Sequence, residues 1–126
     1  MQTLILFALL IFGWDLAWYF AGVQPLFPWQ LKKMLQNGQK PVRLVDVRTE
    51  LEFDWFHIEG AVHRSDILYH MDRYQDKSFD ETAVIICMTG HRSPLVAYQL
   101  QKRGYTHVYN LTGGMLAWKF FGGKTL

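Results

Sequence analysis

Hydrophobic positions follow two different patterns along the chain, and the change falls near Gln24. Over residues 3–23 nearly every side chain is apolar or aromatic, and Asp15 is the only charged one. Beyond this segment, short apolar runs alternate with polar and charged residues, as they do in a water-soluble domain. The pattern therefore predicts two parts, a hydrophobic helix over residues 1–24 and a folded domain over residues 25–126.

The apolar segment has the length of a membrane-spanning helix, which needs about 20 residues. Its Leu, Ile, Phe and Val side chains each favour insertion by roughly 0.3–0.6 kcal/mol, and together they outweigh the roughly 3 kcal/mol that Asp15 costs. A cleavable signal peptide and a helix packed on the domain are the alternatives. No Lys or Arg precedes the segment and no A-x-A-like cleavage site follows it, which counts against the signal peptide. We predict a single-pass membrane anchor at residues 3–23.

The distribution of basic residues predicts the orientation of this anchor. Lys32, Lys33, Lys40 and Arg43 follow the apolar segment, and no basic side chain precedes it. Basic flanks stay on the cytoplasmic side of a membrane. The domain is therefore expected in the cytoplasm, with export behind a signal peptide as the alternative.

Within the domain, four segments have the composition of β-strands. They are rich in β-branched residues or form continuous apolar runs, and they cover residues 42–47, 60–63, 83–87 and 106–111. The run at 83–87 has no polar residue, which is typical of a strand buried on both faces of a parallel sheet.

Five segments have apolar residues at helical spacing or carry helix start and stop signals. These predicted helices cover residues 28–38, 50–56, 66–75, 93–104 and 113–123. Pro28 suits a first helical turn, Gly38 and Gly104 suit helix ends, and Asp66 can cap the third helix. The segment QPLFP at residues 24–28 is predicted as a linker. Strands that alternate with helices predict an α/β fold with a central parallel sheet flanked by helices.

Composition excludes several classes of function. The chain has 126 residues and a formal charge of +2, which is too small to indicate a nucleic-acid partner. Its single cysteine excludes an intramolecular disulfide and a thiolate-rich metal site, and a lone thiol suits a reducing compartment. The five histidines are scattered, so we predict no metal site.

The lone cysteine, Cys87, ends the predicted buried strand, and residues 88–92 connect it to the next helix. Open α/β sheets bind ligands at this edge. The amides of a tight turn and the N-terminus of a helix favour a thiolate, which is the nucleophilic form. Gly90 permits a closed loop, and Arg92 offers a cation to an oxyanion. We predict a nucleophilic Cys87, and the alternative is a buried structural cysteine.

Three motifs carry a resemblance to a known family. Residues 87–93, CMTGHRS, resemble the active-site loop C-x-x-G-x-R-S of rhodanese-like sulfurtransferases. Residues 44–63, LVDVRTELEFDWFHIEGAVH, and residues 108–118, VYNLTGGMLAW, resemble two further signatures of the family, in the family's order. Phe56 stands where the family usually has glycine, and we expect this difference to alter the rim of the site.

The resemblance implies a rhodanese-like domain whose chemistry proceeds through a persulfide on Cys87. A small anionic sulfur donor such as thiosulfate would load the cysteine, and cyanide, a small thiol or a protein thiol would accept the sulfur. The resemblance implies no cofactor. The substrate-binding loop would consist of Met88, Thr89, Gly90, His91 and Arg92.

The resemblance also gives Asp46, Arg48 and Glu52 supporting positions near the loop. We expect Arg48 and Glu52 to form a structural ion pair and Asp46 to anchor a loop by a hydrogen bond. His91 lies inside the loop, where it either faces the donor or is an exposed polar residue at the rim.

Two other functions are considered. Cysteine phosphatases have five residues between their Cys and Arg, whereas four separate Cys87 from Arg92, which favours a sulfur atom over a phosphate. The second alternative is a persulfide carrier or regulatory binding module for a specific membrane or protein partner, with low free turnover.

Overall fold

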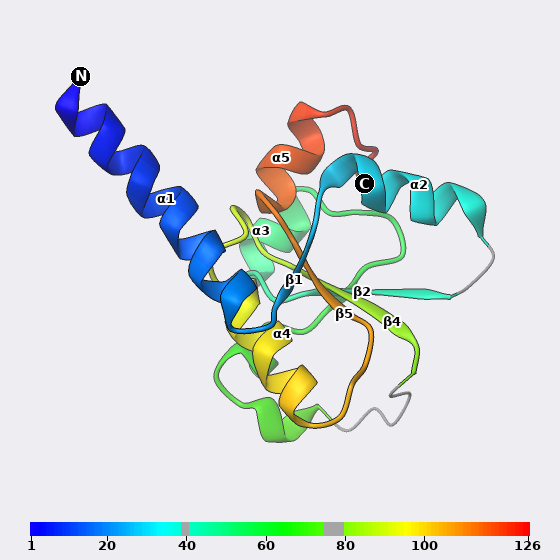
Figure 1. The fold of residues 1–126 in the computed structure, drawn as a ribbon. Helices are drawn as coiled ribbons and strands as arrows, with labels where there is room; N and C mark the ends of the chain where they lie inside the picture. Colours follow the sequence, from blue (N-terminus) through cyan, green and yellow to red (C-terminus); the bar gives the residue numbers. More distant parts are fainter. Residues whose placement is uncertain (39–40, 75–79) are drawn as a thin grey trace.

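The computed structural model of the protein describes residues 1–38, 41–74 and 80–126. Within these residues, five parallel strands form one sheet in the order β1-β5-β4-β2-β3 (Figure 1). The strands are β1 (Gln24–Leu26), β2 (Val42–Asp46), β3 (Val62–His63), β4 (Thr82–Ile86) and β5 (Val108–Leu111). The predicted parallel α/β sheet is confirmed.

The α-helices lie at α1 (Gln2–Phe20), α2 (Pro28–Asn37), α3 (Glu50–Trp55), α4 (Ser93–Lys102) and α5 (Gly114–Phe120). Pro28 begins α2 and Gly38 ends it in the left-handed conformation, as the sequence predicts. Thr49 caps α3 by accepting a hydrogen bond from the amide of Glu52, and the Glu52 side chain accepts one from the amide of Thr49. This reciprocal pair fixes the start of α3 directly after β2.

The central strand β4 is buried on both faces because successive side chains point to opposite sides of the sheet. Ile85 packs with Val96 and Leu100 of α4 on one face. Val84 packs on the other face with Leu31 of α2 and Met115 of α5. These two cores explain why the sequence of β4 is a continuous apolar run.

Two secondary-structure predictions for the domain are wrong. Residues 24–26 of the predicted linker form β1, which pairs with β5 at the edge of the sheet. An edge position tolerates Pro25, which has no amide hydrogen to donate. The predicted helix at 66–75 is instead two short 3₁₀ turns, η1 (Ser65–Leu68) and η2 (Met71–Arg73), and Asp66 pairs with Arg64 rather than capping a helix. The predicted end at Gln75 lies outside the described residues, as does Lys40.

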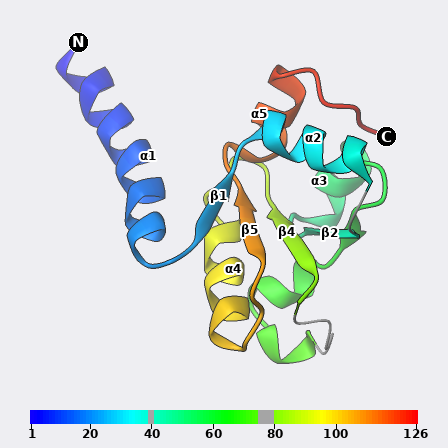
Figure 2. The ribbon, with the colours of Figure 1, turned by 45° about the vertical axis from the view of Figure 1, so that its right-hand side comes forward.

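The N-terminal helix α1 extends away from the domain (Figures 1 and 2). None of its side chains is fully buried. Among the described residues it is the one helix long and apolar enough to cross a membrane. A membrane anchor and a signal sequence share these properties. Only its C-terminal part contacts the domain, where Trp18 packs against Tyr98 of α4 at 5.7 Å between ring centroids.

Candidate active site

Cys87 directly follows β4, and its side chain is fully buried, with 0% exposed. Its Sγ accepts a hydrogen bond from the amide of Gly90 at 3.0 Å. The Ser93 hydroxyl lies 3.3 Å from the same sulfur, in the first turn of α4. The Gly90 amide and the N-terminal end of a ten-residue helix stabilise negative charge on the sulfur, and the Ser93 hydroxyl does so when its proton points to Sγ.

Ser93 and Asn110 link the cysteine to the neighbouring strand. The Ser93 hydroxyl also makes a short hydrogen bond to Oδ1 of Asn110, which lies on β5. Because a hydroxyl has one proton, it serves either the sulfur or Asn110 at any moment. Nδ2 of Asn110 in turn donates to the carbonyl of Gly90 at 3.3 Å. The sequence motifs include both residues but gave neither a role, and Asn110 reaches the loop only because β5 packs beside β4.

Gly90 holds the loop closed against the start of α5. Its φ is +83°, and a Cβ there would lie 2.8 Å from the amide nitrogen of Gly113. The amides of Met115 and Leu116 donate to the carbonyls of Cys87 and Met88 at 2.9 and 3.0 Å. The third sequence motif therefore forms the support on which the Cys87 loop rests.

Arg92 crosses from the loop to α3, where its Nη2 contacts both carboxylate oxygens of Glu52 at 3.2 Å. The two side chains are 38% and 24% exposed. Burial tends to raise the pKa of Glu52, but hydrogen bonds from Thr49 and Arg92 outweigh it, so the pKa lies below its ordinary value. Glu52 is therefore a carboxylate at neutral pH and competes with any donor anion for Arg92.

The predicted ion pair between Arg48 and Glu52 is wrong, because Arg48 turns into the core. Its Nε and Nη2 contact the carboxylate of Asp46 at 2.9–3.1 Å, and both side chains are fully buried. Asp46 also accepts a hydrogen bond from the amide of Arg48, and this is the loop-anchoring hydrogen bond that was expected of Asp46. Arg48 then donates to the carbonyl of Phe56.

Phe56 takes extended backbone angles, with φ −164°, and its side chain is buried. Its ring lies 5.3 Å from the Arg48 guanidinium carbon. The replacement of the family's usual glycine therefore places an aromatic ring beneath α3, against the buried ion pair. Phe56 fills the core here rather than the rim of the site.

The remaining loop residues lie at the rim. Met88 is half-buried and Thr89 is exposed, and the Thr89 hydroxyl lies 2.8 Å from Nδ1 of His91. The carbonyl of His91 accepts a hydrogen bond from the indole of Trp14 on α1 at 3.1 Å. The contact with α1 is a feature that the sequence did not predict.

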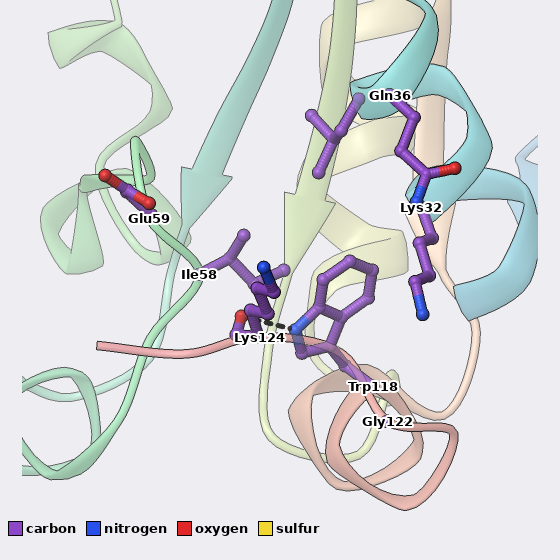
Figure 3. A pocket seen from close by; sticks show the side chains of 8 residues that line it. Lys32, Gln36, Ile58, Glu59, Trp118, Gly122 and Lys124 are labelled. Atoms are coloured by element: carbon purple, nitrogen blue, oxygen red, sulfur yellow. Dashed lines mark hydrogen bonds between the residues drawn. The ribbon is translucent and has the colours of Figure 1, made fainter.

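Two further features of the described residues lie outside the Cys87 loop. Within residues 1–38, 41–74 and 80–126, no cluster of three His, Cys, Asp or Glu side chains is arranged to hold a metal ion. A hollow of about 360 Å³ lies between α2 and the C-terminal segment, lined by residues such as Lys32, Trp118 and Lys124 (Figure 3). None of its lining residues comes from the Cys87 loop, so this hollow is separate from the candidate site.

Residues 28–120 match the family model described as the rhodanese-like domain. The chain belongs to the rhodanese-like domain family. The match includes every site residue discussed here except Trp14 of α1. This result confirms the family that the three sequence motifs indicated.

Similar proteins include sulfurtransferases. The thiosulfate sulfurtransferase GlpE of Coxiella burnetii is 31% identical over 98 residues, covering 77% of this chain and 85% of the relative. The probable adenylyltransferase/sulfurtransferase MoeZ of Mycobacterium tuberculosis is 34% identical over 92 residues. That match covers 72% of this chain, which spans only 23% of the length of MoeZ.

Solved structures show the same fold. A rhodanese-like domain protein from Staphylococcus aureus has a TM-score of 0.64 at 32% identity, covering 76% of this chain and 91% of the other. A protein of unknown function from Rhodopseudomonas palustris, described as a possible tyrosine phosphatase, has a TM-score of 0.73 at 22% identity. The match covers 92% of this chain and 90% of the other chain. At 22% identity, the likeness shows the fold alone.

Proposed function

We propose that this rhodanese-like protein is a sulfurtransferase that moves sulfane sulfur from a donor such as thiosulfate to a thiophilic acceptor through a Cys87 persulfide. The observation that carries the proposal is the sulfur environment, in which the Gly90 amide and the Ser93 hydroxyl both lie within hydrogen-bonding distance of Sγ. The thiosulfate sulfurtransferases among the relatives support it.

The first half-reaction loads the cysteine. The Cys87 thiolate attacks the outer sulfur of thiosulfate, a new S–S bond forms, and the S–S bond of the donor breaks. Sulfite leaves with the electron pair of that bond, and the enzyme holds an anionic persulfide. The amide and hydroxyl that face Sγ lower the cost of the negative charge on the thiolate that attacks the donor.

The second half-reaction regenerates the enzyme. The acceptor attacks the outer persulfide sulfur with its own electron pair, and the Cys87 thiolate leaves. Cyanide would become thiocyanate, and a thiol would become a persulfide. The same hydrogen bonds stabilise the thiolate as a leaving group.

Access to the sulfur requires movement at the rim. Because Cys87 is fully buried, the donor reaches Sγ only when the neighbouring loop side chains move aside. Arg92 is the cation available for the donor, and it must exchange Glu52 for the incoming anion. We assign Arg92 to donor binding, and we assign Asp46 and Arg48 to structural support.

Two alternatives remain distinct from this proposal. A phosphatase is the first, and the fold shared with the possible tyrosine phosphatase from Rhodopseudomonas palustris does not by itself favour this activity. Against it, four residues rather than five separate Cys87 from Arg92, which makes a smaller cradle than a phosphate needs. A persulfide carrier uses the same cysteine chemistry and differs only in its acceptor.

The test compares turnover of sulfur donors and aryl phosphates by the full chain. Wild type is expected to convert thiosulfate and cyanide to thiocyanate, and the Cys87→Ser variant to have none of this activity. Phosphate release that equals or exceeds sulfur transfer would favour the phosphatase. A persulfide that forms but passes only to one protein acceptor would favour the carrier.

We further propose that α1 anchors the protein with its domain in the cytoplasm. Buried Cys87 is a poor labelling site, so the reporter is an exposed residue, His107→Cys, in the Cys87→Ser background. A membrane-impermeant maleimide should label this thiol only after the cells are opened. Labelling in sealed cells would place the domain outside and favour export with a signal peptide.

A further inference from the structure

Exposed apolar side chains gather on the edge of the domain that carries the Cys87 loop. We define the apolar rim as Leu51, Trp55, Tyr69, Leu95 and Leu116. These residues lie on segments that follow the carboxyl ends of the strands, the edge at which Cys87 itself lies. Tyr69 is 82% exposed and Trp55 is 74% exposed, so none of the residues that the structure describes covers these two side chains.

Two clefts border the loop and connect it to this rim. One has a volume of about 600 Å³ and joins the loop residue Met88 to Leu51 and Trp55 of α3. The other has a volume of about 260 Å³ and joins His91 and Arg92 to Tyr69, Leu95 and Trp14. The way to Cys87 is therefore flanked by apolar walls, one of which includes α1.

The C-terminal part of α1 is attached to the same edge. The indole of Trp14 donates to the carbonyl of His91 in the loop, and Trp18 packs on Tyr98. Asp15, the one charge of the helix, lines a small cavity together with Asn110 and so faces the domain. Figure 1 shows α1 running past the loop that precedes α4.

The position of Trp14 within α1 has a direct consequence. Trp14, whose indole contacts the loop, lies inside α1 (Gln2–Phe20) rather than beyond its end. The 19 residues of α1, at about 1.5 Å per residue, span about 28 Å, which is close to the roughly 30 Å hydrocarbon core of a bilayer. A bilayer that takes up α1 in this arrangement must reach Trp14, and therefore the edge that carries the loop.

We propose that the apolar rim lies in the membrane interface, so that Cys87 opens toward the bilayer surface. Tryptophan and tyrosine prefer this zone, since an apolar ring and a polar group are both satisfied there. Glu50 and Asp54 are exposed on the same edge, so the rim belongs at headgroup level and favours zwitterionic over anionic lipid. The substrate consequence, which rests on the proposed function, is an acceptor thiol borne by a membrane molecule.

The placement is tested without any activity, in the Cys87→Ser background. Single cysteines at Tyr69→Cys and Trp55→Cys carry an environment-sensitive fluorophore, and the full chain is reconstituted into phosphatidylcholine vesicles. The matched control is His107→Cys, an exposed position just before β5, at the opposite end of the strands. Circular dichroism checks that each variant is folded.

A blue-shifted emission and quenching by headgroup-linked nitroxide are expected at positions 69 and 55, but not at 107. Emission at the two rim positions that matches position 107 would overturn the proposal, and so would failure of the folded chain to bind vesicles. A blue shift at positions 69 and 55 that appears only when membrane proteins are added to the vesicles would also overturn the proposal and indicate a protein partner. A Cys87 that forms no persulfide would instead contradict the proposed function and leave these fluorescence results unchanged.

Discussion

Two arginines follow the ends of neighbouring strands, and they have opposite environments. Arg48 comes after β2 and is fully buried in an ion pair with Asp46. Arg92 comes after β4, at the end of the Cys87 loop, and pairs with Glu52 while 38% exposed. Both pairs join a guanidinium to a carboxylate at 2.9–3.2 Å, so distance alone does not distinguish them.

Burial is what separates their roles. The buried charge of Arg48 cannot be released without leaving an uncompensated carboxylate in the core. Arg92 can exchange Glu52 for another anion, since water screens the carboxylate that it leaves. The comparison indicates that the β2 arginine holds the fold and the β4 arginine is available to a donor.

The largest expected effect is a difference in how much each of the two ion pairs contributes to the free energy of unfolding. Asp46→Asn leaves the Arg48 cation buried without its counter-ion, and we expect the free energy of unfolding to fall by about 3–5 kcal/mol. Glu52→Gln, the matched change at the exposed pair, should cost less than about 1 kcal/mol. Urea denaturation of both variants measures the difference, and equal losses would remove the distinction between the two arginines.

The second effect concerns the loop that carries Arg92. Gly90→Ala should displace the loop, because its Cβ would lie 2.8 Å from the amide nitrogen of Gly113 and 3.0 Å from the carbonyl oxygen of Leu111. The matched control is Gly60→Ala, with a similar φ of +88° and no atom within 4 Å of the added carbon. The control should lose about 1–2 kcal/mol of stability from backbone strain alone.

Sulfur transfer then distinguishes the two glycine variants. Gly90→Ala should lose most of its thiosulfate turnover, because the amide that faces Sγ moves. Gly60→Ala should retain turnover at a temperature where it is folded. Equal turnover in the two variants would show that the loop geometry around Cys87 is unimportant for the chemistry.

A third, smaller effect tests the availability of Arg92. Arg92→Gln should raise KM for thiosulfate by roughly tenfold, the ratio that about 1.4 kcal/mol of lost binding gives. Arg64→Gln is the control, since Arg64 forms a partly exposed ion pair with Asp66 outside the loop. Steady-state kinetics on both variants provide the measurement, and an unchanged KM in Arg92→Gln would assign the donor to another cation.

The smallest effect is a pH dependence of the exposed pair. Because the folded-state pKa of Glu52 lies below its ordinary value of 4.5, ionised Glu52 stabilises the fold above that value. This contribution is lost as the pH falls through the lowered folded-state pKa. The stability difference between wild type and Glu52→Gln should therefore shrink toward acid pH, as denaturation at a series of pH values would show. A difference that grows on acidification would contradict the direction of the shift.

The sequence predicted most of the fold because its signals are local. A continuous apolar run identified β4, and Pro28 and Gly38 marked the ends of α2. The edge strand β1 was missed because three residues that include a proline give no strand signal, and only pairing with β5 makes them a strand. The turns at 65–73 were predicted as a helix because their composition does not record the 3₁₀ geometry.

The candidate site was predicted only as far as its motifs extend. Cys87, Gly90 and Arg92 lie close together in the sequence, and the structure places these residues in one loop. The partner of Arg48 was predicted wrongly because nothing local in the sequence shows that Arg48 turns into the core toward Asp46 while Glu52 pairs with Arg92 of another loop. Ser93 ends the loop motif itself, whereas Asn110 and Trp14 approach the loop through tertiary packing, for which the sequence has no local signal.

The central claim is that Cys87 carries the transferred sulfur, and intact-mass spectrometry after thiosulfate treatment tests it most directly. The account predicts that wild type gains the mass of one sulfur atom, that a thiol acceptor removes it, and that Cys87→Ser gains nothing. Sulfur uptake and transfer by Cys87→Ser at the wild-type level would contradict the account.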